Sequence, residues 1–306
     1  MKRNIYSKLW MIFFVLMGAA CTNQVEDAIP VSDQPIEFSV QSDWKEIPNT
    51  RSNDGRTEFT KGDSIQIFGF HWSSSGKVQK FMYRSVNEPG RGQIVGYDGK
   101  NWNYSPKRFW PKEGKLDFYA SYPHYSVLND EKKRKMTYEQ AVNPLQLDLL
   151  WGVSTNHNCT TTGRRSNVVI TMKHALAKVN ITFDSSSLGD IKQAIVSAYK
   201  AGYFLETDTR GIPKWIVEKK SDINTATLFP YNNLPTIVDA TVFILPDKIT
   251  GLILTKLDGT KIDASEEIKK YTFEAGKVYN LKISKGVQKK NTNTRSIAMS
   301  VRCVSE

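Results

Sequence analysis

The sequence has few cysteines, and its first apolar run is too short to cross a membrane as a helix. Cysteine occurs only at positions 21, 159 and 303 of 306 residues. The apolar run near the start covers residues 9–17, whereas a helix needs about 20 residues to span a bilayer. A composition of 40% hydrophobic and 11% aromatic residues is typical of a globular protein.

The motifs of several common enzyme classes are also missing. There is no G-x-x-x-x-G-K-[ST] phosphate loop, no H-E-x-x-H zinc motif and no G-x-S-x-G nucleophile elbow. The histidines (His71, His124, His157 and His174) are far apart in the sequence, and no spacing with cysteine suits a metal ion. We therefore expect a protein that is not an enzyme and that needs no metal or cofactor.

Positive charge is in excess but is not concentrated. The chain has 42 Lys and Arg against 31 Asp and Glu, a formal net charge of +11. Apart from a short run at 132–135 and the pair Arg164-Arg165, the basic residues are scattered. This pattern predicts a solvated surface rather than a nucleic-acid interface.

The start of the chain is typical of an exported protein. A basic segment (1–8) is followed by the apolar run and by the small residues Gly18-Ala19-Ala20, which predicts a signal peptide over residues 1–20. The Ala-Ala-Cys ending resembles a bacterial lipobox, in which the cysteine, here Cys21, is acylated and begins the mature protein. The alternative is an ordinary signal peptide with an incidental cysteine.

The next residues predict a tether between a lipid and a folded domain. Residues 22–35 are rich in Asp, Pro and small polar residues, so we interpret 21–35 as a lipidated tether. The pair Glu26-Asp27 resembles the acidic tag of surface lipoproteins in the Bacteroides group. The predicted location is the outer face of the outer membrane. In an exported protein Cys159 and Cys303 could form a disulfide, although spacing alone does not establish it.

From residue 36 onward the chain reads as a succession of short strands. Apolar and polar residues alternate at 36–40, 64–70, 115–122, 168–172, 177–183, 240–245 and 277–283, with Gly, Pro, Asn and Asp between many of these segments. The pattern predicts an all-β protein of two tandem antiparallel β-sandwich domains, at 36–185 and 186–286. Residues 191–201 are the exception, because their pattern also allows a helix.

The last residues form a separate segment, 287–306. Its first part is polar, and then Ile297, Met299, Val301 and Cys303 fall on one face of an alternating stretch. One interpretation is a last strand paired within its own domain. The other is a donor strand offered to another subunit.

Two further groups of residues have both a structural and a functional interpretation. His174 lies in an apolar β-rich stretch, where a hydrogen-bonded structural histidine is expected. Glu206 and Asp208 lie near Tyr203 and Trp215 in the sequence, a combination that can line a sugar site. Core packing is the simpler interpretation, because aromatic residues in β-sandwiches mostly lie in the core.

Several stretches resemble the fimbrillin family of Bacteroides-type bacteria. They are the strand FTKGDSIQIF at 59–68, the run WPKEGKLDFYASYP at 110–123, the pair DLLWG at 148–152 and MKHALAKV at 172–179, and the segment FEAGKVY at 273–279. The order and spacing of these stretches are similar to those of the family from about residue 36 to 284.

The resemblance implies two transthyretin-like β-sandwiches, made as a surface lipoprotein precursor and assembled into fimbriae that contribute to adhesion. In that mechanism a protease cleaves after a basic residue, for which Arg51 in Thr50-Arg51-Ser52 is the candidate, and a strand of another subunit fills the groove that opens. The implied partners are other fimbrial subunits, the outer membrane through the lipid, and a host protein or glycan. The alternative is a monomeric surface lipoprotein that binds a glycan or host protein without polymerising.

Overall fold

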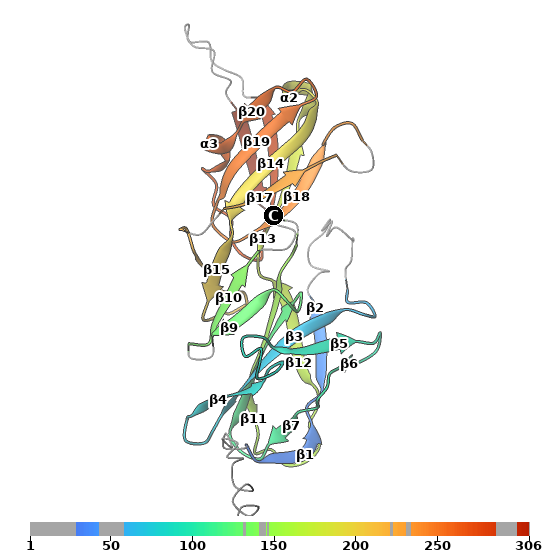
Figure 1. Ribbon diagram of the computed structural model, residues 1–306, viewed down its shortest axis with the longest axis vertical. Helices are drawn as coiled ribbons and strands as arrows, with labels where there is room; N and C mark the ends of the chain where they lie inside the picture. Colours follow the sequence, from blue (N-terminus) through green and yellow to red (C-terminus); the bar gives the residue numbers. More distant parts are fainter. Residues whose placement is uncertain are drawn as a thin grey trace, which may run out of the picture.

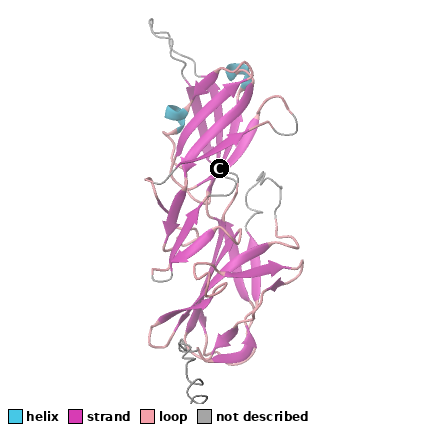
Figure 2. Cartoon of the chain, viewed as in Figure 1, coloured by secondary structure: helices cyan, strands magenta, loops and turns pink. Residues whose placement is uncertain are grey.

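The computed structural model describes residues 29–42, 58–130, 133–140, 145, 147–220, 223–230, 234–285 and 299–305. These residues are mostly strands and loops, with two helices of four residues each among them (Figure 2). The prediction of a mostly β protein is confirmed. Figure 1 shows an elongated molecule with three groups of strands along its long axis. We call these groups the N-terminal barrel, the middle sheet and the C-terminal sandwich.

The N-terminal barrel is an eight-stranded sheet that closes on itself. Its strand order is β4-β3-β5-β6-β2-β12-β11-β8, and β8 also pairs with β3. The strands are β2 (Phe38–Ser42), β3 (Ser64–Trp72), β4 (Val78–Met82), β5 (Gln93–Tyr97), β6 (Trp102–Asn103), β8 (Lys115–Tyr122), β11 (Leu150–Asn158) and β12 (Val168–His174). A separate two-stranded sheet pairs β1 (Val31–Pro35) with β7 (Phe109–Pro111).

The alternation along the barrel strands sends side chains to two different apolar clusters. On β8, Leu116, Phe118 and Ala120 lie in the cluster inside the barrel, as their shared face in the sequence predicted. Tyr119 points the other way and packs against a second cluster, which also contains Phe68 of β3. The barrel therefore has an apolar core and, in addition, an apolar patch on its outer face.

The middle sheet covers this outer patch. Its order is β16-β15-β10-β9, with β9 (Val127–Asp130), β10 (Lys135–Glu139), β15 (Ala201–Phe204) and β16 (Ile216–Val217). Met136, Tyr138 and Phe204 of this sheet pack with Trp151 of the barrel in one cluster. The sequence interpretation did not include this sheet, because its strands come from two distant parts of the chain.

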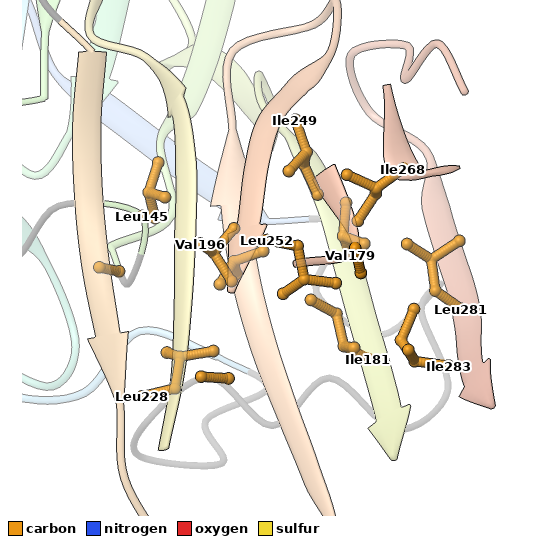
Figure 3. Packing of buried hydrophobic residues seen from close by; sticks show 14 of the residues in the cluster. Leu145, Val179, Ile181, Val196, Leu228, Ile249, Leu252, Ile268, Leu281 and Ile283 are labelled. Carbon is orange, nitrogen blue, oxygen red and sulfur yellow. The ribbon is translucent and has the colours of Figure 1, made fainter. Parts of the chain in front are cut away.

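The C-terminal sandwich consists of two four-stranded sheets, ordered β18-β13-β21-β22 and β17-β14-β19-β20. The strands are β13 (Ala177–Phe183), β14 (Ile191–Tyr199), β17 (Ile223–Leu228), β18 (Asp239–Ile244), β19 (Ile249–Lys256), β20 (Lys261–Asp263), β21 (Val278–Lys285) and β22 (Met299–Ser305), with the short helices α2 (Ser185–Leu188) and α3 (Ser265–Ile268). Figure 3 shows residues of both sheets, such as Val179 and Leu252, packed in one core.

The helical interpretation of residues 191–201 is wrong. Residues 191–199 form strand β14, which pairs with β17 on one side and β19 on the other. Ala194, Val196 and Ala198 are buried at every second position, which is the period of a strand. Tertiary pairing therefore decides the conformation of a segment whose local pattern was ambiguous.

The expectation of purely antiparallel sheets is wrong at two strand pairs. β2 runs parallel to β12, and β13 runs parallel to β21. Each pair joins segments about 100 residues or more apart, and local alternation carries no information about the direction of so distant a neighbour.

Strand β13 belongs to the C-terminal sandwich by its hydrogen bonds. It pairs with β18 and β21, and its residues Val179 and Ile181 lie in the sandwich core. The predicted first domain, 36–185, includes this strand. In the structure the change from barrel to sandwich falls between β12 and β13, at residues 174–177.

Candidate strand-exchange site

Strand β2 is enclosed by neighbours on both sides. It pairs in parallel with β12, with Phe38 opposite Val168 and Ser42 opposite Met172, and it pairs antiparallel with β6, where Phe38 lies opposite Trp102. Its main chain therefore bridges two strands of the barrel. If β2 left, donor and acceptor groups on both neighbours would lose their partners.

The side chains around the start of β2 reach into the barrel core. Ile36 is 0% exposed and Phe38 is 3% exposed. The ring of Phe38 meets the edge of Phe118 at 5.3 Å between centroids and lies 5.7 Å from Tyr104. Burying a side chain of this size stabilises a fold by about 1.5–3 kcal/mol. β2 thus fills a cavity that is shaped for large apolar side chains.

Hydrogen bonds tie the segment 29–42 to the barrel at several points. The Tyr104 hydroxyl donates to the carbonyl of Ile36 at 2.8 Å, and the amide of Val168 donates to the carbonyl of Glu37 at 2.7 Å. The exposed pair between Lys107 and Glu37 (3.1 Å) adds little, since surface ion pairs contribute about 0–1 kcal/mol. We call residues 29–42, which carry β1 and β2, the leading segment.

The leading segment precedes the predicted cleavage site in the sequence. Arg51 and the predicted lipidation site Cys21 both lie outside the described residues. Cleavage after Arg51 would break the covalent link between the leading segment and β3. Only the contacts of β1 and β2 would then hold the segment in place.

The predicted donor segment forms an edge strand of the C-terminal sandwich. β22 pairs antiparallel with β21, with Met299 opposite Lys285, Val301 opposite Ile283 and Cys303 opposite Leu281, while Ile297 lies outside the described residues. This pairing agrees with the first interpretation of the tail, that of a last strand paired within its own domain. Since β22 is the last strand in its sheet order, it has one neighbour, unlike β2.

Cys159 is a free thiol, so the disulfide with Cys303 that the sequence left open is absent. The side chain of Cys159 is 2% exposed and lies in the barrel cluster. Burial raises the pKa of this thiol to about 11, although Arg165 opposes the shift. The thiol is therefore protonated near neutral pH, which makes it a poor nucleophile.

The DLLWG and MKHALAKV motifs meet at the junction between barrel and sandwich. The ring Nδ1 of His174 and the carboxylate of Asp148 form a close buried pair. Burial lowers the pKa of Lys178 to about 8, and the charge of Asp148 opposes that shift. His174 is thus hydrogen-bonded inside the structure, as the sequence predicted. Both motifs hold strands together at this junction, where Leu150 of β11 lies opposite His174 of β12.

The acidic and aromatic residues near 203–215 do not form a single site. Trp215 donates its indole N–H to the carbonyl of Ala175 at 2.7 Å and packs against Phe204. Asp208 pairs with Arg210 in a turn, and Lys135 lies over the ring of Tyr203. Glu206 lines a separate hollow. The core interpretation is therefore confirmed for Trp215.

Within the residues that the structure describes, no group of His, Cys, Asp or Glu is arranged to hold a metal ion. No helix within those residues is long and apolar enough to cross a membrane.

The fimbrillin-like family model matches residues 50–299. The chain belongs to the fimbrillin-like family. This is a family of fimbrial and cell-adhesion proteins without enzymatic activity, which places this fimbrillin-like chain among proteins of cell-surface fimbriae. The absence of catalytic motifs agrees with that membership.

Two solved structures with TM-scores of 0.50 or more share this fold at low sequence identity. A candidate cell adhesion protein from Bacteroides uniformis is 17% identical, with a TM-score of 0.53 over 89% of this chain and 98% of that one. A second candidate adhesion protein, from Bacteroides ovatus, is 12% identical, with a TM-score of 0.50 over 90% and 98%. The tip fimbrial protein Mfa3 from Porphyromonas gingivalis is 10% identical, with a TM-score of 0.45 over 80% and 95%. No curated protein sequence matches the chain.

Sequence reasoning placed a strand at 36–40, where β2 covers 38–42, and assigned 31–35, which form β1, to the tether. It also missed what surrounds β2. The parallel partner β12 begins at Val168, far along the chain from Phe38, and the contact of Tyr104 with Ile36 joins residues 68 positions apart. The one available signal was the apolar alternation of 168–172, which marks a strand but not its neighbour.

Proposed function

We propose that this fimbrillin-like protein is a fimbrial subunit that assembles by strand exchange. It is exported as a lipoprotein acylated at Cys21 and delivered to the outer membrane. A protease cleaves after Arg51 and releases the leading segment, and the strand β22 of another subunit then occupies the place of β2. The two folded parts are transthyretin-like domains, and the assembled fimbria contributes to adhesion.

The observation that supports this proposal is the position of β2. It is the strand before the candidate cleavage site, it lies between β6 and β12, and its first residue, Phe38, is buried in the core. Loss of this strand leaves two unpaired edges and an apolar groove in the barrel. A strand from another chain can fill such a groove by β-strand addition. Its main-chain hydrogen bonds to the two edges give affinity, and its alternate side chains give specificity.

The direction of β2 adds a reason why a second strand can replace it. β2 runs parallel to β12 over residues 38–42, and parallel pairs are slightly less stable per residue than antiparallel pairs. A donor that enters antiparallel to β12 forms the more stable pair on that side. It would run parallel to β6, but β6 pairs with β2 only at Phe38, so less is lost there. The alternating apolar positions Ile297, Met299, Val301 and Cys303 give a donor side chains for the pockets left by Ile36 and Phe38.

A protease experiment tests the role of Arg51. The mature protein is treated with a trypsin-like protease and run on gels without boiling, where polymers appear as ladders. We expect ladders from the wild type and from the control Arg56→Ala, which removes a nearby basic site, but none from Arg51→Ala. Equal ladders from both variants would rule out Arg51 as the processing site.

A deletion tests the tail. Removing residues 296–306 should abolish the ladders without preventing cleavage, because the donor strand is then missing. Ladders that persist in this deletion would mean that another segment is the donor.

The pairing of β22 with β21 favours a second candidate function. A tail that is already paired within its own sandwich suits a monomeric surface lipoprotein that binds a glycan or host protein without polymerising. For that protein, cleavage at Arg51 yields no ladders in any variant. Fatty-acid labelling of the wild type but not of Cys21→Ala is expected in both cases and tests the anchor alone.

A further inference from the structure

A hollow of about 270 Å³ lies where the middle sheet ends over the outer face of the barrel. Its floor comes from β8 and β11 of the barrel, with Tyr119, Trp151 and Thr155 among the lining residues. Its walls come from the end of the middle sheet, with Arg134 just before β10 and Glu206 just after β15. The barrel and the middle sheet therefore both contribute residues to the hollow.

The floor of the hollow is aromatic. The rings of Tyr119 and Trp151 are stacked with 6.1 Å between centroids and 29° between planes. Phe204 contacts Trp151 edge to face at 4.9 Å. Trp151 and Phe204 are buried by these contacts, so the partly exposed ring of Tyr119 provides the aromatic surface of the floor.

The walls carry charges of both signs together with hydroxyl groups. Arg134 and Glu206 lie near the ends of β10 and β15, which pair through Met136 and Phe204. Thr155 and Thr207 add hydroxyl groups to the lining. The guanidinium of Arg134 lies over the ring of Trp72 at 4.7 Å, and the carboxylate of Glu206 is held by Lys214 at 3.0 Å. Both charged groups lie at the rim, and the Glu206 carboxylate is largely exposed there.

One feature of the hollow has no explanation in the fold alone. Trp151 is 1% exposed, and its indole Nε1 has no hydrogen-bond acceptor among the residues that the structure describes. Buried polar groups without a partner are rare in native proteins.

We propose that this hollow binds one sugar residue of a glycan. A sugar hydroxyl donates and accepts hydrogen bonds at once, so adjacent hydroxyls match a guanidinium, a carboxylate and threonine hydroxyls set around one ring. The C–H face of the sugar packs on the partly exposed ring of Tyr119, and an acceptor on the sugar supplies the partner that the indole of Trp151 lacks. The volume is below the usual range of about 300–1,000 Å³ for drug-sized ligands, which suits a single ring.

The proposal is tested by saturation-transfer NMR with the chain from residue 21 carrying Cys21→Ser. The probes are methyl glycosides of neutral hexoses, of N-acetylhexosamines and of a uronic acid, at millimolar concentration. We expect at least one class to bind. Thr155→Trp, which fills the hollow from an exposed position, should abolish the signal. Glu206→Gln should weaken binding by about tenfold or more, since it removes a hydrogen bond to a charged group.

The matched control is Glu274→Gln. Glu274 pairs with Lys277 at 2.8 Å in the C-terminal sandwich, much as Glu206 pairs with Lys214, but it does not line the hollow. This variant should bind as the wild type does. Binding that survives in Thr155→Trp with an unchanged melting temperature, or the absence of binding for every probe, would overturn the proposal. The site does not depend on cleavage at Arg51, so a failure of polymerisation leaves this test unaffected.

Discussion

Strands β2 and β22 stand near opposite ends of the described chain and are held in different ways. β2 has a neighbour on each side and places Phe38, 3% exposed, inside the barrel. β22 pairs with β21 alone, at the edge of its sheet. An edge strand is released by breaking one set of hydrogen bonds, whereas an enclosed strand leaves a gap with two unsatisfied edges. This difference fits the proposed roles, in which the place of β2 is the acceptor and β22 is the donor.

The largest expected difference between the two strands is in stability. Phe38→Ala should lower the free energy of unfolding by about 3–5 kcal/mol, because it opens a cavity against Phe118 and Tyr104. Deletion of residues 296–306 should cost less, since only an edge strand is lost. Urea unfolding of both variants measures the difference. A deletion that costs as much as Phe38→Ala would contradict the comparison.

A second expected effect, at the junction between the barrel and the sandwich, is a dependence of the free energy of unfolding on pH. Burial lowers the pKa of Lys178 from 10.5 to about 8, so between these values the folded protein binds fewer protons than the unfolded chain. Stability should therefore rise with pH from about 8 to 10.5, by at most about 1.4 kcal/mol per pH unit.

Lys178→Met serves as the control for this rise, which should be absent in the variant. Urea unfolding across the pH range measures the effect. Deletion of the tail should leave the rise intact, because Lys178 lies on β13, which pairs with β18 and β21 rather than with β22. A rise of the same size in Lys178→Met would mean that other groups cause it.

A smaller effect is expected where the leading segment enters the barrel. Tyr104→Phe removes the hydroxyl that donates to the carbonyl of Ile36 and should cost about 0.5–1.5 kcal/mol. Hydrogen exchange should show faster opening of β2 but not of β22. Equal acceleration in both strands would mean that the two ends of the chain open together.

Some of this architecture was predictable from local sequence, and some was not. Strands such as β3 and β8 follow from alternation, because one face of each is buried in the barrel. The middle sheet was not predictable, since β10 meets β15 across more than 60 residues and neither strand marks the other. The pattern of Ile191–Tyr199 permitted a helix until its two neighbouring strands were known.

The candidate strand-exchange site was likewise predictable only in part. The strand at 36–40 and the alternation of Met299, Val301 and Cys303 were visible in the sequence. The two-sided position of β2 depends on pairing with β6 and β12, which no local pattern encodes. Arg51 and Cys21 lie outside the described residues and remain predictions.

The most direct test of strand exchange is a binding measurement with a labelled peptide of residues 296–306. The acceptor is the tail-deleted protein, cleaved after Arg51 while folded. The account predicts that the peptide binds the cleaved protein, displaces the leading segment and ignores the uncleaved protein. Equal binding to both forms, or binding to neither, would contradict it.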